Sequence, residues 1–388
     1  MQAYDALGEH RTATDTDHAT SRWLARRLAD AGLATTLQPF AAPLFVPERC
    51  ELRLAGSAHH CFPGWPVAPT SAAGLSTTIV PHEAPGLAGK IALVRPGYRQ
   101  GGTWAAPGFG EVAMQAARAG AAAVVVVTDG PTGGVIALNA VPSRFTWPIP
   151  VVIAAGEDGD RLSAAAAAGE AATLVSTGVA GPAATATNVV ARRRGAGKTL
   201  VVSTPMSGWF HCAGERATGI AVFLALAHEL AHGTDADLLF VAFSGHELDE
   251  MGGGFFLKHG APTPDRVRAW LHVGANAAMQ PLALDRGAAR PSSVPGPERR
   301  ITTTSAALAA AQRAFVPQAG FGAPSLMNDA NAYGELSIFY EAGYRTLAGI
   351  GGANPLFHTR LDRADISTTP AILETVRSAC SDFLRGFP

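Results

Sequence analysis

The residues of this chain best suited to chemistry are His246 and Glu247, which stand side by side in a short turn. The turn follows the apolar run 238–243, which has the length and composition of a buried strand. Parallel α/β proteins build their sites at the carboxyl ends of such strands. An imidazole can transfer protons near neutral pH, and a carboxylate can bind a metal ion. The turn therefore predicts a catalytic or metal-binding site.

A second group of candidates lies just before a predicted helix. Glu215 stands at the helix start, where the helix dipole alone also favours a carboxylate. His211 and Cys212 precede it, and a helix start can lower the pKa of a thiol. Because adjacent residues seldom face each other, two interpretations of Cys212 stay open: a nucleophile, or a buried and inert thiol.

Strands alternate with a helix in the C-terminal half of the chain. We expect these elements at 199–203, 217–231, 238–243 and 270–273. The alternation predicts an α/β fold, a mixed and mostly parallel sheet flanked by helices. Residues 1–44 add a helix and a strand, so we expect the catalytic domain to consist of 1–44 and 186–388.

Between these two segments the sequence pattern changes to short strand-like runs that are separated by glycine and proline residues. The clearest segments are 89–94, 111–119, 123–127 and 149–153. In this order they resemble the protease-associated domain, a β-rich module with few helices. The resemblance implies that residues 45–185 form an inserted module, which acts as a lid or as a wall of the substrate site.

Four segments outside this module resemble, in order, the superfamily of zinc aminopeptidases, glutamate carboxypeptidases and glutaminyl cyclases. They are residues 204–219, 245–247, 270–276 and 354–362. On this resemblance Pro205 and Gly274 stand where one metal ion would have its own two ligands, and Ser207 replaces a supporting aspartate. One of the family's two metal sites is therefore expected to be lost.

The same resemblance leaves Glu215, Glu247 and His358 as a complete ligand set for one zinc ion. His246 stands where the family has a glutamate base, so we expect it to shuttle the proton, with a ligand or a core histidine as the alternatives. The implied function is a zinc-dependent hydrolase of an amide or related C–N bond. Its substrate would be a small molecule or a short peptide.

Two hypotheses from other classes stay open. A metal-free enzyme could use His211, Cys212, His246 and Asp329 for nucleophilic or acid–base chemistry on a metabolite. A catalytically inactive binding protein is the second, because a fold does not guarantee chemistry.

The composition of the chain indicates which classes of partner it is not suited to bind. A formal net charge of -1 and the lack of a long Lys/Arg run argue against nucleic acid or an anionic membrane as the main partner. With 47% hydrophobic residues the chain can bury a large core. We expect a cytoplasmic protein, and it could form a homo-oligomer. Its four cysteines are expected to stay reduced, and a disulfide between Cys50 and Cys61 is the alternative.

Overall fold

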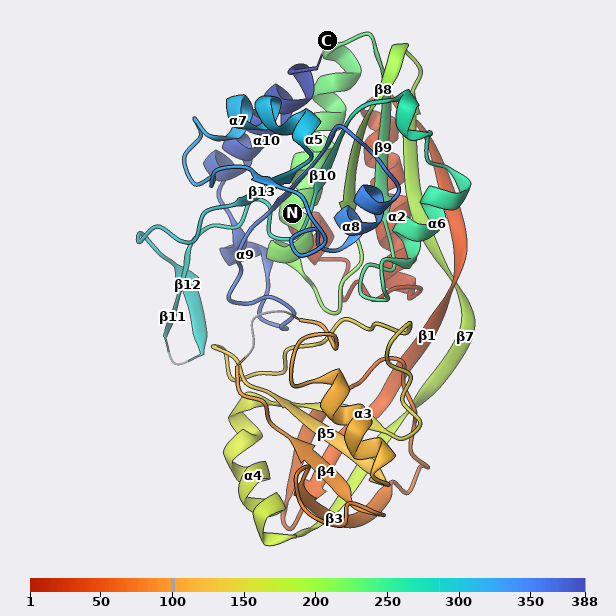
Figure 1. Cartoon of the computed structure of the whole chain (residues 1–388), viewed down its shortest axis with the longest axis vertical. Coiled ribbons are helices and arrows are strands. Elements are labelled where there is room, and N and C mark those ends of the chain that lie inside the picture. The colour runs from red at the N-terminus through yellow and green to blue at the C-terminus, as the bar shows by residue number, and fades with distance from the viewer. Residues whose placement is uncertain (99–101, 286, 388) are drawn as a thin grey trace.

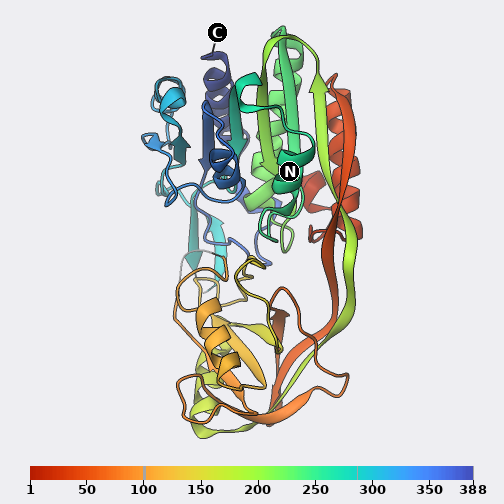
Figure 2. The same cartoon turned by 45° about the vertical axis from the view of Figure 1, so that its right-hand side comes forward.

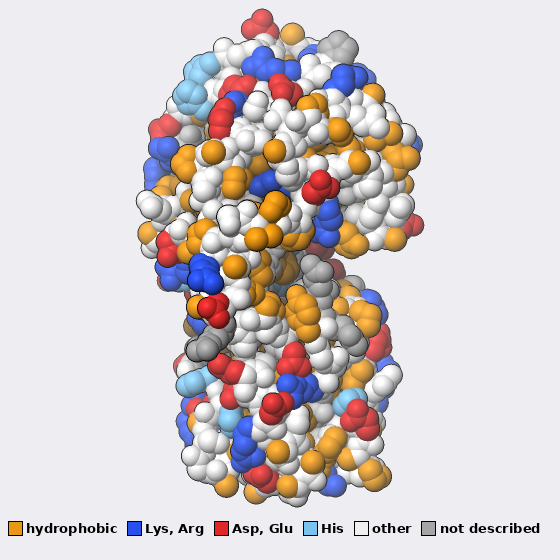
Figure 3. Space-filling model, turned by 90° about the vertical axis from the view of Figure 1, so that its left-hand side faces the viewer, with side chains coloured by type: hydrophobic (Ala, Val, Ile, Leu, Met, Phe, Trp, Pro, Cys, Tyr) orange, Lys and Arg blue, Asp and Glu red, His pale blue; other side chains and the backbone are white. Residues whose placement is uncertain are grey.

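The computed structural model describes residues 1–98, 102–285 and 287–387 and consists of two parts joined by a pair of long strands (Figure 1). The larger part contains both termini. Figure 2 shows the two strands running side by side from this part into the smaller one, and Figure 3 shows a narrower waist between the parts.

The larger part, which we call the core, is built on a sheet with the strand order β1-β7-β9-β8-β10-β15-β13-β14. The strands β9, β8, β10 and β15 are parallel neighbours, whereas β7 pairs antiparallel with both β1 and β9. β13 pairs antiparallel with β15 and parallel with β14. The strand bounds are β1 Ala34–Leu54, β7 Ala171–Arg193, β8 Ala196–Pro205, β9 Ala236–Phe243, β10 Val267–Val273, β13 Arg300–Thr303, β14 Ser325–Leu326 and β15 Leu347–Gly351. The predicted α/β fold with a mixed, mostly parallel sheet is confirmed.

Helices cover both faces of this sheet. Apolar side chains of α2, α5, α7 and α10 pack on one face, and those of α6 and α8 pack on the other. The helix bounds are α1 Gln2–Asp5, α2 Asp15–Asp30, α5 Thr218–Gly233, α6 Met251–His259, α7 Leu308–Phe315, α8 Glu335–Glu341, α9 Ala364–Ser367 and α10 Pro370–Arg385. A separate two-stranded sheet is formed by β11 (Leu282–Asp285) and β12 (Ala288–Pro291).

Every residue of β9 is buried, as the apolar run 238–243 predicts for a central strand. The side chain of Trp270 on β10 stacks on Phe339 of α8, with ring centroids 4.2 Å apart. Burying one large apolar side chain contributes about 1.5–3 kcal/mol, so these contacts fix α8 firmly against the sheet. This packing matters because α8 begins at Glu335, which belongs to the candidate site.

The smaller part is a closed ring of strands in the order β1-β2-β6-β5-β4-β3-β7, closed by the pairing of β7 with β1. Its remaining elements are β2 Ser57–Pro63, β3 Leu75–Pro81, β4 Ile91–Val94, β5 Ala123–Thr128, β6 Val151–Ala155, α3 Gly110–Arg118 and α4 Gly159–Ala168. The predicted boundaries at 44 and 186 fall inside β1 and β7, which run through both parts and whose pairing shifts register between Ala42 and Leu44 and between Pro47 and Arg49. The domain limits themselves stay a prediction.

Among the described residues, none of the helices is both long and apolar enough to cross a membrane. All four cysteines are free, so the alternative disulfide between Cys50 and Cys61 is not formed.

Candidate functional site

A single π-helical turn, Ala213–Ala217, leads into α5 and places Glu215 and Arg216 inside the protein. Cys212 precedes the turn in a left-handed backbone conformation, with φ of 49°. The carboxylate of Asp362 accepts hydrogen bonds from the backbone nitrogens of Gly214 (2.7 Å) and Glu215 (2.9 Å). These bonds satisfy donors that a helix start leaves free. π-Turns of this kind occur often at functional sites.

Arg216 is the centre of a buried charge network. Its Nη2 atom lies 2.8 Å from Glu215 Oε1 and 2.7 Å from Glu247 Oε1. Its Nε donates to the carbonyl oxygen of Ser207 at 2.7 Å, and the Ser207 hydroxyl donates to Glu247 Oε2 at 2.7 Å. Burial alone would lower the pKa of Arg216, but the two carboxylates outweigh it and raise that pKa. The guanidinium therefore stays charged.

Glu215 is held as a carboxylate by its neighbours. Burial opposes its charge, but Arg216 and His358 lower its pKa to about 2. His358 Nε2 lies 3.2 Å from Glu215 Oε1, while the geometry of the pair falls short of a hydrogen bond. On its other side His358 Nδ1 donates to the carbonyl oxygen of Ala137 at 2.8 Å. Ala137 belongs to the smaller part of the molecule, which therefore orients the ring.

The arrangement does not fit a zinc ion. Both carboxylate oxygens of Glu247 are already used, one by Arg216 and one by Ser207. Only Glu215 and His358 remain, and zinc sites in proteins use three or four protein ligands. A divalent ion beside the guanidinium would also be repelled, by roughly 8 kcal/mol at 4 Å and an effective dielectric constant of 20. Within the described residues no group of three His, Cys, Asp or Glu side chains has a metal-binding arrangement.

A second pair of charges lies at the end of β9. His246 Nδ1 lies 2.8 Å from Oε2 of Glu335, which is completely buried. Burial alone would lower the pKa of His246, but Glu335 outweighs it and raises the pKa to about 9. Burial alone would raise the pKa of Glu335, but His246 outweighs it and lowers that pKa to about 2. The His246 side chain is 12% exposed, so it forms the accessible edge of the site.

His272 lies behind this pair and does not compete for the charge. Its Nε2 is 3.6 Å from Glu335 Oε2, and its Nδ1 is 2.9 Å from the Ser203 hydroxyl. Burial lowers its pKa to about 4, so it is neutral. It acts as a core histidine.

The smaller part closes directly over the cluster. The backbone nitrogen of Ala140 donates to the carbonyl oxygen of Glu247 at 2.8 Å, and that of Ala137 donates to the carbonyl of His358 at 3.0 Å. A side chain at Gly102 would collide with the ring of His358. Glu215, Glu247 and His358 are consequently at most 2% exposed.

Comparison with known proteins agrees with this architecture. The family model described as the PA domain matches residues 64–162. The whole chain superimposes on a zinc aminopeptidase from Bacillus subtilis with a TM-score of 0.79 at 20% sequence identity, covering 100% of this chain and 93% of that one. The chain has the aminopeptidase fold with an inserted PA domain.

Two other solved structures share the aminopeptidase fold. A peptidase M28 precursor from Shewanella amazonensis SB2B has a TM-score of 0.74 at 17% identity, over 99% of this chain and 92% of that one. An aminopeptidase from Aneurinibacillus sp. strain AM-1 has a TM-score of 0.68 at 17% identity, over 100% and 93%. A sequence search among curated proteins finds no match.

The aminopeptidase fold brings some of the predicted residues together and separates others. Glu215, Glu247 and His358 meet, and His246 lies beside them through its own pair. The expected loss of one metal site at Pro205 and Gly274 stays a prediction.

His211, Cys212 and Asp329 are not assembled into a catalytic group. His211 Nδ1 is bound to Asp5, at 2.8 Å from its carboxylate and 2.9 Å from its carbonyl oxygen. Cys212 is buried, burial raises its pKa far above the ordinary value, and its sulfur accepts from the backbone nitrogen of Phe210. Asp329 is exposed after β14, and no described bond links it to His246. The Cys/His pair is thus not a dyad.

Two residues of the site were missing from the sequence-based candidates. Arg216 follows Glu215 directly, and its basic side chain beside a candidate metal ligand was the available signal. Glu335 lies before the segment 354–362. From the sequence alone, a buried glutamate at this position could not be distinguished from an exposed one at the start of a helix.

Proposed function

We propose that the protein is a hydrolase of an amide or related C–N bond in a small molecule or short peptide, and that it works without zinc. The observation that supports this most is the pair His246–Glu335, in which a buried carboxylate orients an imidazole at the accessible edge of the site. A carboxylate that holds one ring nitrogen directs the other toward a substrate.

In this proposal Arg216 takes over the electrostatic role of the metal within the cluster. It balances Glu215 and Glu247 and keeps the end of β9 and the π-turn in place. A buried guanidinium with two carboxylates is too enclosed to polarise a substrate carbonyl. Its role is to position the turn that carries His246.

His246 differs in one respect from the predicted proton shuttle. Since its pKa is raised to about 9, it begins the cycle protonated at neutral pH. Water would add to the substrate carbonyl and form the C–O bond of a tetrahedral adduct, and His246 would then give its proton to the leaving nitrogen as the C–N bond breaks. A hydroxyl of the former adduct would return a proton to the neutral imidazole as the acid product forms, so that the imidazolium is regenerated.

The test is a turnover assay on EDTA-dialysed protein, with aminoacyl-p-nitroanilides and N-acyl amino acids as substrates. His246→Ala should lower turnover by about 100-fold or more, because general acid–base catalysis contributes roughly 10²–10⁴. His228→Ala, an exposed histidine on α5, is the matched control and should leave turnover unchanged. Turnover that requires added zinc, or an active His246→Ala variant, would contradict the proposal.

The closure of the site by the PA domain favours a second candidate, a binding protein without turnover. Substrates cannot reach Glu215, Glu247 or His358 while Ala137 and Ala140 cover them. Calorimetric binding of a substrate analogue in the absence of any turnover across the panel would support this candidate and refute the hydrolase.

A further inference from the structure

A cavity of ≈ 460 Å³ lies where the core meets the PA domain. It is separate from the buried cluster, because none of its lining residues belongs to that network. The core lines it with Glu9, Arg11, Phe210 and Arg360, while β1, β2 and Val135 form the other walls. Its volume falls within the roughly 300–1,000 Å³ of small-molecule sites, which often lie between domains.

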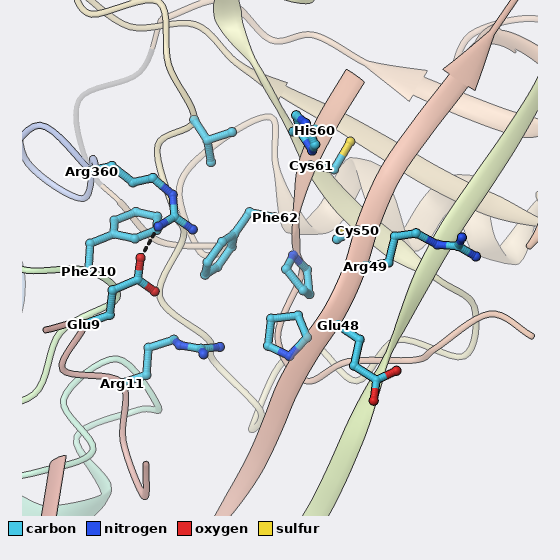
Figure 4. Close-up of a pocket in the computed structure, with 13 residues that line it drawn as sticks. Glu9, Arg11, Glu48, Arg49, Cys50, His60, Cys61, Phe62, Phe210 and Arg360 are labelled. Carbon is cyan, nitrogen blue, oxygen red and sulfur yellow. Dashed lines mark hydrogen bonds and ion pairs between the residues drawn. The ribbon is translucent and has the colours of Figure 1, made fainter. Parts of the chain in front are cut away.

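The charged side chains of the cavity leave one positive charge in excess. Figure 4 shows Arg11 and Arg360 converging on the cavity, whereas Glu48 and Arg49 point away from it. Arg360 forms an ion pair with Glu9. Arg11 has no carboxylate partner within hydrogen-bonding distance among the described residues, and it makes one long bond of 3.4 Å to the carbonyl oxygen of Phe45.

Arg11 is the stronger sign of an anion site. Its Nε atom is buried and makes no hydrogen bond within the described residues. Within the described residues the Arg11 guanidinium has no carboxylate within hydrogen-bonding distance to balance its charge, and an anion that enters the cavity would supply that balance. A planar guanidinium matches the two oxygens of a carboxylate.

Aromatic and proline side chains form one part of the remaining lining, beside Cys50, His60 and Cys61. Phe62 and Phe210 are buried with ring centroids 5.3 Å apart, and the guanidinium of Arg360 lies 4.7 Å above the Phe210 ring. Pro47 and Pro63 extend this surface. The cavity therefore combines one surplus positive charge with an aromatic wall.

We propose that this cavity binds a small carboxylate with a flat apolar body, whose anionic end lies between Arg11 and Arg360 and whose body lies against Phe62. The carboxylate can belong to a free organic acid or to the C-terminus of a short peptide. This binding does not depend on the proposed hydrolase activity.

Isothermal titration of the full chain with three probes tests the proposal. The probes are 3-phenylpropionate, its neutral amide 3-phenylpropionamide, and the dipeptide Ala-Phe. Both carboxylates should bind, and the amide should bind at least about 10-fold more weakly, since it lacks the charge-assisted hydrogen bonds. The tighter of the two carboxylates identifies the source. Equal binding of the amide, or no heat with either carboxylate, would overturn the proposal.

Variants locate the site. Arg11→Gln and Arg360→Gln should each weaken 3-phenylpropionate by about 10-fold, while Arg26→Gln on the exposed face of α2 should not. Arg360 is 66% exposed, so its variant folds even if the Arg11 variant does not. Unchanged affinity in the folded Arg360 variant would show that the anion binds elsewhere.

Discussion

The two halves of the buried charge network differ in the kind of cation that balances their carboxylates. In one half Arg216 balances Glu215 and Glu247, and these carboxylates raise the pKa of its guanidinium, which therefore keeps its proton around neutral pH. In the other half His246 balances Glu335, and its imidazole titrates near pH 9. The first half is fixed, whereas the second can exchange a proton.

This difference separates structure from chemistry within one site. A group that never changes its protonation state can hold a turn in place but cannot transfer a proton. A titratable group at an accessible edge can do so. Damage to the fixed half should therefore appear mainly as lost stability, and damage to the other half should appear as altered pH dependence and turnover.

The largest effect is expected from Arg216→Met. It leaves two buried carboxylates without their cation, and breaking a buried ion pair by removing one partner costs about 3–5 kcal/mol. The free energy of unfolding from urea titration should fall by that amount, while Arg216→Lys should lose less because it keeps the charge. A loss below ~1 kcal/mol in the methionine variant would show that the network is not the fixed half of the site.

The same variant also tests the zinc question. Once the guanidinium is gone, Glu215, Glu247 and His358 are free to bind a metal ion. Added Zn²⁺ should then raise the melting temperature of the EDTA-dialysed variant, because a ligand that binds only the folded state stabilises it. The wild-type protein should not respond. An equal rise in both proteins would mean that Arg216 does not occupy the place of the ion.

The next effect concerns pH and the titratable half. The folded pKa of His246 is raised from 6.5 to about 9, so its stabilisation is complete below pH 6.5 and is lost as the pH rises through about 9. Glu335 has its pKa lowered from 4.5 to about 2, so its contribution is present above pH 4.5 and is lost as the pH falls through about 2. His246 and Glu335 therefore both contribute in full between pH 4.5 and pH 6.5.

His246→Gln keeps a hydrogen-bond donor for Glu335 but removes the charge. The wild type should be more stable than this variant by roughly 1–3 kcal/mol at pH 6.5, and the difference should shrink toward zero above pH 9. His228→Gln should run parallel to the wild type. Chemical unfolding at a series of pH values measures the difference in unfolding free energy between the two proteins. A difference that stays constant from pH 6.5 to 10 would show that His246 does not titrate in this range.

The fold was predictable because its elements carry strong local signals. The apolar run of β9 and the periodic helix α5 are each specified by their own residues. The length of β1 was not predictable. We expected this strand within residues 1–44, yet it continues to Leu54 and contains Pro39, Pro43 and Pro47. A proline is tolerated there because β1 is an edge strand of the core sheet.

The candidate site was predictable only in part, for a physical reason. The resemblance to the zinc aminopeptidases identified Glu215, Glu247 and His358, which the structure brings together. It could not show that Arg216 points into the cluster, because that depends on the π-turn rather than on helical periodicity. It also missed Glu335, since a buried glutamate and an exposed one look alike in sequence until the opposite charge is located.

The smallest effect is expected at Cys212, which joins the fixed half through its backbone and tests whether that half contains any reactive group. The thiol is 1% exposed and burial raises its pKa far above the ordinary value, so almost no thiolate exists at pH 8. Cys380, buried in the core away from the site with a pKa raised to about 12, is a matched control within the same chain. Both should react with iodoacetamide at the same slow rate in the native protein, limited by unfolding, and at once in denaturant. Peptide mass spectrometry distinguishes the two sites.

Cys212→Ala should likewise change turnover by no more than about twofold, because general acid–base chemistry at His246 does not involve the thiol. Selective and rapid alkylation of Cys212, with turnover lost in step, would assign it a nucleophilic role and place the chemistry in the half described here as fixed.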